Sequence, residues 1–370
     1  MSPGRALHRL LLVGRMLVAW CATSAFAADG PQPKWPSMFP CPPDALGFSS
    51  GVVQLPGGSS VHYVERAPMS SPTSAAAPPS PPLVLVHGWP DSWRSWLRVL
   101  PLLPLDRRVI ALDQLGYGDS SKPMDDQSFS IPSKARELRA FLDELRVGPG
   151  IQLVGHSMGS MVAWEFAARQ PAFVEALMLI GTSWRIPADV AEQFRAMIGG
   201  LQEVTYEFAE GFQYSNFADV KAAGPWFPPT TVYESLRAPL HTWKAGMEGL
   251  LNLTEAYAEA ALPRITARTL LVRGEADAVC SEAVYRGFLR LLPGAASAGM
   301  VTVPGTAHSV QWEESGAVAV AGLIGRQLSD AHAGGAGGTA VGLAREPRPG
   351  ASTTSAATTA AAAAAAALFA

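Results

Sequence analysis

A serine between two glycines is the residue pattern in this sequence that could best do chemistry. The segment LVGHSMGS (153–160) places Ser157 between Gly155 and Gly159, after an apolar run and before the helical pattern MVAWEFAARQP. On a sharp strand-to-helix turn, glycines let the chain cross closely and the serine hydroxyl stands above the sheet. Because a serine hydroxyl alone is a poor nucleophile, this interpretation requires a base and a group that orients the base.

The order of residues along the chain limits which histidine could be that base. Where a nucleophilic serine stands on such a strand-to-helix turn of an α/β sheet, the base follows both the nucleophile and the acid along the chain. Only His308 and His332 come late enough. His308 lies in VPGTAHSVQWEE, between a strand-like run and a helical run, whereas His332 borders a Gly/Ala-rich tail. We predict His308 as the base. We expect a structural role for His156, because adjacent residues on such a turn point apart.

The orienting carboxylate is expected after a strand that lies between the serine and the histidine. The segment TLLVRGEADAV supplies Asp277, and Glu275 competes with it from two residues nearer the strand. We prefer Asp277, since the shorter carboxylate after the turn fits the order Ser, Asp or Glu, His. Its role would be to hold the imidazole tautomer and to stabilise the imidazolium.

Two backbone N–H groups are expected to stabilise the oxyanion of an acyl-transfer reaction. One is that of Met158, at the start of a helix, where unpaired amides and the helix dipole favour negative charge. The other is that of Trp89, in the segment His87-Gly88-Trp89-Pro90 that follows the apolar run LVLVH. Gly88 permits the close approach that such a donor needs.

Short apolar runs and helical patterns alternate along the chain. LVLVH, RVIAL, IQLVG, ALMLI and RTLLVR are typical of strands buried on both faces, and SVHYVER alternates apolar and polar residues. PSKARELRAFLDELRV carries leucine and phenylalanine at helical spacing. The pattern predicts an α/β fold with a mainly parallel twisted sheet and helices on both faces. Ligands of such sheets bind beyond the carboxyl ends of the strands.

The segment 184–264 interrupts this alternation. It lacks a clear buried strand and is rich in Phe, Trp and Tyr. We predict an inserted helical lid that divides the core into residues 28–183 and 265–332. Its aromatic side chains would either line the site for an apolar substrate or pack the lid onto the core, and both interpretations stay open.

From about Val52 to Leu328 the chain resembles the α/β-hydrolase superfamily. The motifs HGWPDSW, DQLGYGDSS, GHSMGS, GEAD and GTAH stand in the family order. The His-Gly-x-Pro form resembles the epoxide hydrolase and haloalkane dehalogenase branch. In that branch the elbow, which is the strand-to-helix turn that carries the nucleophile, has an aspartate. Ser157 departs from that branch and favours an acyl-enzyme. The resemblance also implies a cis bond between Trp89 and Pro90, which proline permits at low cost.

These residues predict a serine hydrolase that cleaves a carboxylic ester, or a similarly activated carbonyl compound with an apolar part, through an acyl-enzyme. An acyltransferase or a cofactor-free perhydrolase-like enzyme would use the same elbow with another acceptor. A non-catalytic small-molecule receptor could retain the fold. No metal-binding or nucleotide-binding motif stands out in the sequence, so we expect no cofactor and no metal.

Composition agrees with a globular protein that binds a small molecule. The 370 residues are 48% hydrophobic and carry a net charge of -3, which argues against a nucleic-acid partner. No run of about 20 apolar residues predicts a stable membrane span. The oligomeric state stays open.

The amino-terminal residues 1–27 have the features of a secretory signal peptide. A basic start without acids precedes the apolar MLVAWCA and a small-x-small AFA site. We therefore predict the secretory pathway or an extracellular location, and the alternative is a transit peptide to an organelle lumen. Asn252-Leu253-Thr254 is a glycosylation sequon, in agreement with secretion.

Three further features fall outside the alternating pattern. Removal of a signal peptide leaves Cys41 and Cys280, as free thiols or as one disulfide. The Pro/Ser/Ala stretch 67–82 reads as a long exposed loop. The Gly/Ala-rich residues 333–370 are predicted to form a low-complexity disordered tail.

Overall fold

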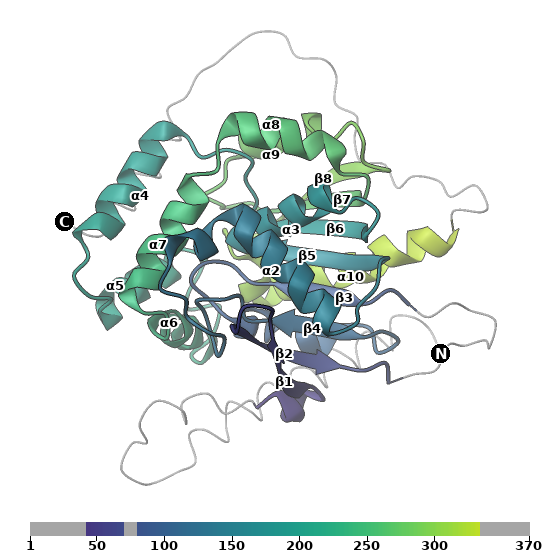
Figure 1. Cartoon of the computed structure of the whole chain (residues 1–370), viewed down its shortest axis with the longest axis horizontal. Helices are drawn as coiled ribbons and strands as arrows, with labels where there is room; N and C mark the ends of the chain where they lie inside the picture. The colour runs from purple at the N-terminus through teal and green to yellow at the C-terminus, as the bar shows by residue number, and fades with distance from the viewer. Residues whose placement is uncertain (1–41, 70–79, 334–370) are drawn as a thin grey trace.

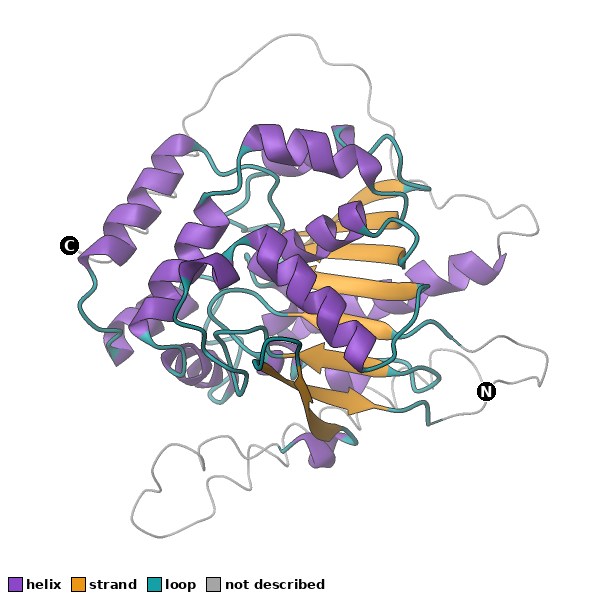
Figure 2. Cartoon of the chain, in the orientation of Figure 1, coloured by secondary structure: helices purple, strands orange, loops and turns teal. Residues whose placement is uncertain are grey.

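The computed structural model describes residues 42–69 and 80–333, which build one eight-stranded sheet with helices around it (Figures 1 and 2). The spatial order is β1-β2-β4-β3-β5-β6-β7-β8, in which β1, β2 and β4 pair antiparallel and the remaining pairs are parallel. The strands are β1 (Ser49–Gln54), β2 (Ser60–Arg66), β3 (Leu83–Val86), β4 (Val109–Leu112), β5 (Ile151–His156), β6 (Val174–Ile180), β7 (Arg268–Gly274) and β8 (Ala298–Val303).

The α-helices connect the strands and cover the sheet. In Figure 1, α2 and α3 lie in front of the central strands and α10 lies behind them, as the predicted fold class requires. The helices are α2 (Ile131–Glu144), α3 (Met158–Arg169), α4 (Ala188–Gly200), α5 (Tyr206–Tyr214), α6 (Phe227–Leu236), α7 (Leu240–Leu251), α8 (Glu255–Ala261), α9 (Glu282–Arg290) and α10 (Glu314–Ala333). The predicted α/β fold with a mainly parallel sheet is confirmed.

Several sequence predictions concern residues outside the described ranges. These are the signal peptide at 1–27, Cys41, most of the loop 67–82 and the tail from residue 334 onward. Cys280 is buried, with its Sγ 3.7 Å from the carbonyl oxygen of Gly181. Among the described residues, none of the helices has the length and the apolar character that a bilayer crossing requires.

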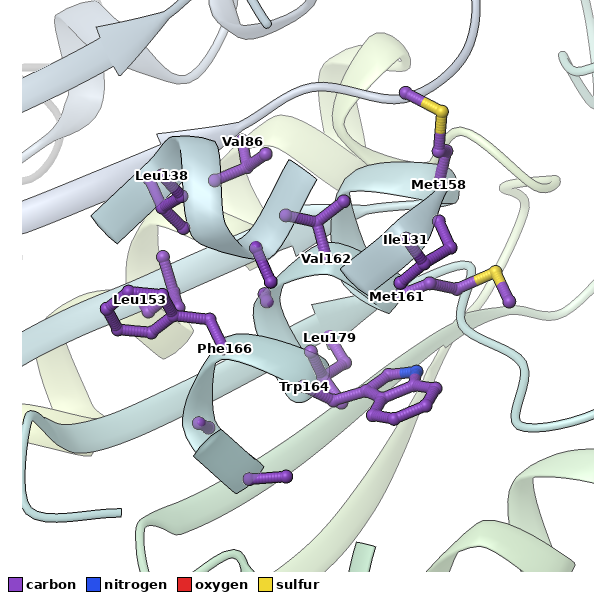
Figure 3. Close-up of a cluster of buried hydrophobic side chains, with 14 of the residues drawn as sticks. Val86, Ile131, Leu138, Leu153, Met158, Met161, Val162, Trp164, Phe166 and Leu179 are labelled. Atoms are coloured by element: carbon purple, nitrogen blue, oxygen red, sulfur yellow. The ribbon is translucent and has the colours of Figure 1, made fainter. Parts of the chain in front are cut away.

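The central strands are buried on both faces, and successive residues supply two separate hydrophobic clusters. In β3, Val84 and Val86 belong to the cluster under α2 and α3, whereas Leu83 and Leu85 belong to the cluster that contains residues of α10. This two-residue alternation follows from the pleat of a strand. Figure 3 shows the first cluster, with α3 laid on the sheet through Met161, Val162, Trp164 and Phe166.

The helices α4 to α8 come from the segment 184–264, all of which the structure describes and none of which is strand. In Figure 1, α4 to α7 lie beside the sheet on the side toward which the arrow of β4 points. Since β3 and β5 to β8 run parallel with β4 in one sheet, this is the side of their carboxyl ends. On this side, Trp243 of α7 contacts Trp89, with ring centroids 4.8 Å apart.

Candidate active site

Ser157 sits at the turn between β5 and α3, and its backbone is strained. Its φ of 50° lies in the left-handed region, which a non-glycine residue adopts at a cost of about 1–3 kcal/mol. Gly155 and Gly159 make the turn possible by close packing of backbone. A Cβ on Gly155 would lie 2.3 Å from the carbonyl oxygen of Gly159, and a Cβ on Gly159 would lie 2.3 Å from that of His87.

The imidazole of His308 lies between the serine hydroxyl and a carboxylate. Its Nε2 is 3.0 Å from Oγ of Ser157, and its Nδ1 is 3.1 Å from Oδ1 of Asp277. Ser157 is partly exposed, whereas His308 and Asp277 are buried. When Nδ1–H donates to the carboxylate, Nε2 is free to accept the serine proton. The structure thus brings together the three side chains that the sequence placed at 157, 277 and 308.

Hydrogen bonds between two loops set the position of Asp277 relative to His308. The N–H of Glu275 donates to the carbonyl of Val303 over 3.0 Å, and the N–H of Ala276 donates to that of Thr306 over 2.9 Å. These bonds connect the loop after β7 to the end of β8 and to the loop that follows it. The carboxyl ends of two neighbouring parallel strands therefore deliver the acid and the base to one point.

The Asp277 carboxylate is buried but stabilised as an anion. Burial alone would raise its pKa, but the charge of His308 and the hydrogen bonds from His308 and the N–H groups of Val279 and Cys280 outweigh burial and lower it. The hydroxyl of Tyr285 adds a contact of 3.3 Å to Oδ2. A carboxylate held in this way stays ionised at neutral pH and can orient an imidazole.

The alternatives raised by the sequence lie elsewhere. Oε2 of Glu275 accepts the N–H of Gly305 over 3.2 Å, whereas the carboxylate bonded to the His308 imidazole is that of Asp277. His332 lies in the last turn of α10. The Nε2 of His156 lies 3.2 Å from the Ser309 hydroxyl, and burial together with the charge of His308 lowers the pKa of His156 well below its usual value.

The backbone N–H groups of Trp89 and Met158 donate to no acceptor among the described residues. Met158 is the first residue of α3, where helix amides lack intrahelical partners. Gly88 brings the neighbouring loop close, since a Cβ on it would lie 3.1 Å from Cβ of Ser157. The bond between Trp89 and Pro90 is cis, as the family resemblance implied.

The loop after β3 is held by His87, which is buried and neutral. Its Nδ1–H donates to the carbonyl of Gly88 over 2.7 Å, and its Nε2 accepts the N–H of Gln114 over 3.0 Å. Burial lowers the pKa of His87 to about 4. The side chain of Gln114 donates in turn to the carbonyl of His87 over 2.7 Å. These bonds keep the Gly88–Trp89 backbone in place beside Ser157.

Two groups of described residues place side-chain ligand atoms close enough for a metal ion: Asp277 with Cys280 and His308, and His62 with Asp113 and Asp119. In the first group, burial raises the pKa of the Cys280 thiol well above its usual value, which opposes the thiolate that metals prefer. In the second group, Asp119 is ion-paired with Arg237. In both groups an imidazole nitrogen already bonds a carboxylate.

Sequence reasoning missed several residues that support this arrangement. Gln114 directly follows the Asp113 of the DQLGYGDSS motif, and its two bonds to His87 were not anticipated. Glu313 accepts the N–H of Ala307, next to His308, and the N–H of Ala218 from the segment 184–264, over 3.0 and 2.9 Å. The motif offered a signal for Gln114, whereas the contact of Glu313 with Ala218 joins residues 95 positions apart.

Curated relatives resemble only part of this chain. Over 156 residues, 42% of this chain, it is 33% identical to the Bifunctional epoxide hydrolase 2 of Mus musculus, and the match covers 26% of that protein. Over 138 residues, 37% of this chain, it is 32% identical to the Serine hydrolase-like protein of Danio rerio, covering 40% of it. The chain therefore spans roughly a quarter to two fifths of the length of these relatives.

Similarity of fold extends further than similarity of sequence. A thermophilic esterase from Thermogutta terrifontis aligns with 77% of this chain and 99% of its own, with a TM-score of 0.64 and 21% identity. The sequence model of the alpha/beta hydrolase fold family matches residues 81–315, a range that contains Trp89, Met158, Ser157, Asp277 and His308. With the elbow, the sheet order and this match in agreement, the chain belongs to the α/β-hydrolase fold family.

Proposed function

We propose that this α/β hydrolase is a carboxylesterase that uses Ser157 as nucleophile. The observation that carries the proposal is the continuous hydrogen-bonded path from Ser157 Oγ to His308 Nε2, over 3.0 Å, and from His308 Nδ1 to Asp277 Oδ1, over 3.1 Å. A hydroxyl becomes a competent nucleophile when an adjacent base removes its proton as it attacks.

The reaction would proceed in two halves. Ser157 Oγ attacks the ester carbonyl while His308 Nε2 takes its proton, and the N–H groups of Trp89 and Met158 stabilise the oxyanion. The C–O bond to the alcohol then breaks, and His308 returns the proton to the departing alcohol. Water, deprotonated by His308, attacks the acyl-enzyme and releases the acid together with the Ser157 hydroxyl.

Side-chain chemistry at position 157 separates this proposal from epoxide hydrolysis. In a nucleophilic mechanism on an epoxide, an aspartate forms an alkyl ester whose carbonyl water can then attack. A serine would form an ether, which has no carbonyl and resists hydrolysis. The similarity to epoxide hydrolases therefore supports a common fold, whereas the serine at position 157 supports an acyl-enzyme mechanism.

Aromatic side chains beside the proposed oxyanion donor favour an apolar group in the substrate. The ring of Trp89 contacts Phe212 of α5 and Trp243 of α7, with centroid distances of 5.1 and 4.8 Å. Trp243 is fully buried and Trp89 nearly so, whereas Phe212 is partly exposed, so an apolar part of the substrate would pack against the edge of this aromatic cluster. We infer that the preferred esters carry an apolar acyl or alcohol part.

A substrate panel with the full-length chain tests the proposal. Esters, thioesters, lactones and epoxides are assayed with the wild type and with Ser157→Ala. We expect ester turnover that falls by at least about four orders of magnitude in Ser157→Ala. Epoxide turnover that survives in Ser157→Ala would overturn it. Product analysis with a competing alcohol or peroxide separates hydrolysis from acyl transfer.

A further inference from the structure

A second hydroxyl–imidazole–carboxylate arrangement lies at the edge of the sheet. Oγ of Ser50, in β1, is 2.8 Å from Nε2 of His62, in β2. Nδ1 of His62 is 2.8 Å from Oδ2 of Asp113, the first residue after β4. The atoms and their order match those at Ser157. β2 is three strand positions from β5, about 14 Å, so the two arrangements are separate.

Asp113 determines which nitrogen of His62 carries the proton. The carboxylate is fully buried and also accepts the N–H of Trp93 at Oδ1 over 2.7 Å and that of Asp119 at Oδ2 over 2.9 Å. Burial would raise its pKa, but the hydrogen bond and charge of His62, with smaller contributions from His87 and the Asp119 amide, outweigh burial and lower it. In neutral His62, Nδ1–H therefore donates to Asp113, and Nε2 presents its lone pair to the Ser50 hydroxyl.

Ser50 and His62 differ in solvent exposure, and a reactive serine requires this difference. Ser50 is exposed on the edge strand β1, whereas His62 is buried with 7% of its surface exposed. A reagent can therefore reach the hydroxyl while the base stays shielded from water. The neighbouring Ser49 is also exposed, but its hydroxyl donates to the carbonyl of Glu65 over 3.3 Å and has no imidazole partner.

We propose that Ser50 is a second nucleophilic serine, activated by His62 and Asp113, that accepts acyl or phosphonyl groups from compounds with a good leaving group. With a fluorophosphonate, the Ser50 O–P bond forms, the P–F bond breaks and fluoride departs. The hydroxyl proton passes to Nε2 of His62 and then to solvent. Because Ser50 lies within a paired strand and not at a helix start, we expect one stable modification per chain and no turnover.

The experiment uses full-length Ser157→Ala protein and an alkyl fluorophosphonate, with intact-mass and peptide mass spectrometry. We expect a single adduct on Ser50 and none on Ser49, at a rate about 100- to 1,000-fold below that of Ser157 in the wild type, the effect of a missing oxyanion donor. Two double variants, Ser157→Ala/Ser50→Ala and Ser157→Ala/His62→Asn, are compared with Ser157→Ala. We expect that adding Ser50→Ala or His62→Asn abolishes the adduct. Asn at 62 can still donate to Asp113 but has no basic nitrogen.

Unfolding provides a control that does not depend on how the His62 variant folds. In urea-unfolded Ser157→Ala, Ser49 and Ser50 should react equally slowly, because the activating contacts are gone. Each of three outcomes would overturn the proposal: no adduct on Ser50 in the folded protein, equal labelling of Ser49 and Ser50 in the folded protein, or an undiminished rate in a folded His62→Asn variant. None of these outcomes bears on Ser157, whose role is read from ester turnover.

Discussion

Gly88 and Ser157 lie so close that a single methyl group would not fit between them without movement. A Cβ on Gly88 would be 3.1 Å from Cβ of Ser157 and 2.8 Å from Nδ1 of the His156 ring. His156 is fixed on its other side by Ser309, with 3.2 Å between Nε2 and the hydroxyl. The space for a side chain at position 88 is therefore absent at the point where the proposed Trp89 donor approaches the nucleophile.

Replacing Gly88 by alanine should lower turnover with little change in fold. The added methyl group would push the Gly88–Trp89 backbone away from Ser157, and loss of one oxyanion donor costs about 100- to 1,000-fold in kcat. Gly148→Ala is the matched control, because a Cβ there meets nothing within 4 Å. Steady-state ester kinetics check this, and equal kcat values for the two variants would contradict the proposed donor.

The two carboxylates of the GEAD segment should differ sharply in importance. We expect Asp277→Asn to lower kcat by about 10⁴-fold, because the amide would favour the wrong tautomer of His308. Glu275→Gln should change kcat less than about threefold, since its carboxylate contacts the amide of Gly305. Both variants keep the side-chain shape, so activity is compared directly. A larger loss in Glu275→Gln would reverse the assignment.

Asp91 should make the protein less stable as the pH rises. Burial raises its pKa to about 8 in the fold, above the ordinary value of 3.8, and nearby Glu234 and Asp113 add to the shift. A raised folded pKa contributes stability that is complete below about pH 4 and is lost as the pH rises through 8. Asn mimics the protonated acid and does not titrate. The stability of Asp91→Asn relative to wild type should therefore increase by several kcal/mol between pH 4.5 and 8.5.

Urea unfolding at the two pH values measures this difference. Asp126→Asn, which replaces an exposed carboxylate, serves as the control and should show no comparable trend. An advantage of Asp91→Asn that is independent of pH would mean that the Asp91 carboxyl does not change its protonation between these values.

We propose that the chain enters the secretory pathway, and Asn252 offers a direct check. Asn252 is exposed at the carboxyl end of α7, where its side-chain oxygen accepts a hydrogen bond from the Arg195 guanidinium over 3.1 Å. Expressed with residues 1–27 in a eukaryotic cell, the protein should carry one glycan that an N-glycosidase removes and that Asn252→Gln abolishes. Delivery to an organelle without glycan would instead favour the transit-peptide interpretation.

Local patterns in the sequence were sufficient for the central strands of the sheet and for the turn that carries Ser157. Continuous apolar runs predicted β3 to β7 because strands buried on both faces need no polar positions, and the Gly-x-Ser-x-Gly spacing located Ser157 because only glycine fits the crossing at 155 and 159. The edge strand β1 was not predicted. It faces solvent, and only one of its six residues is buried, so its hydrophobic signal is weak.

Contacts between distant segments were decided only by the tertiary structure. The sequence favoured Asp277 over Glu275 as the shorter carboxylate after the turn, but hydrogen bonds from the loop after β7 to Val303 and Thr306 determine which carboxylate reaches His308. The contact of Ser50 with His62 depends on the register of β1 on β2, and the contact of His62 with Asp113 depends on β2 pairing with β4. A sequence specifies which side chains exist and their local periodicity, whereas strand pairing determines which of them come within hydrogen-bonding distance.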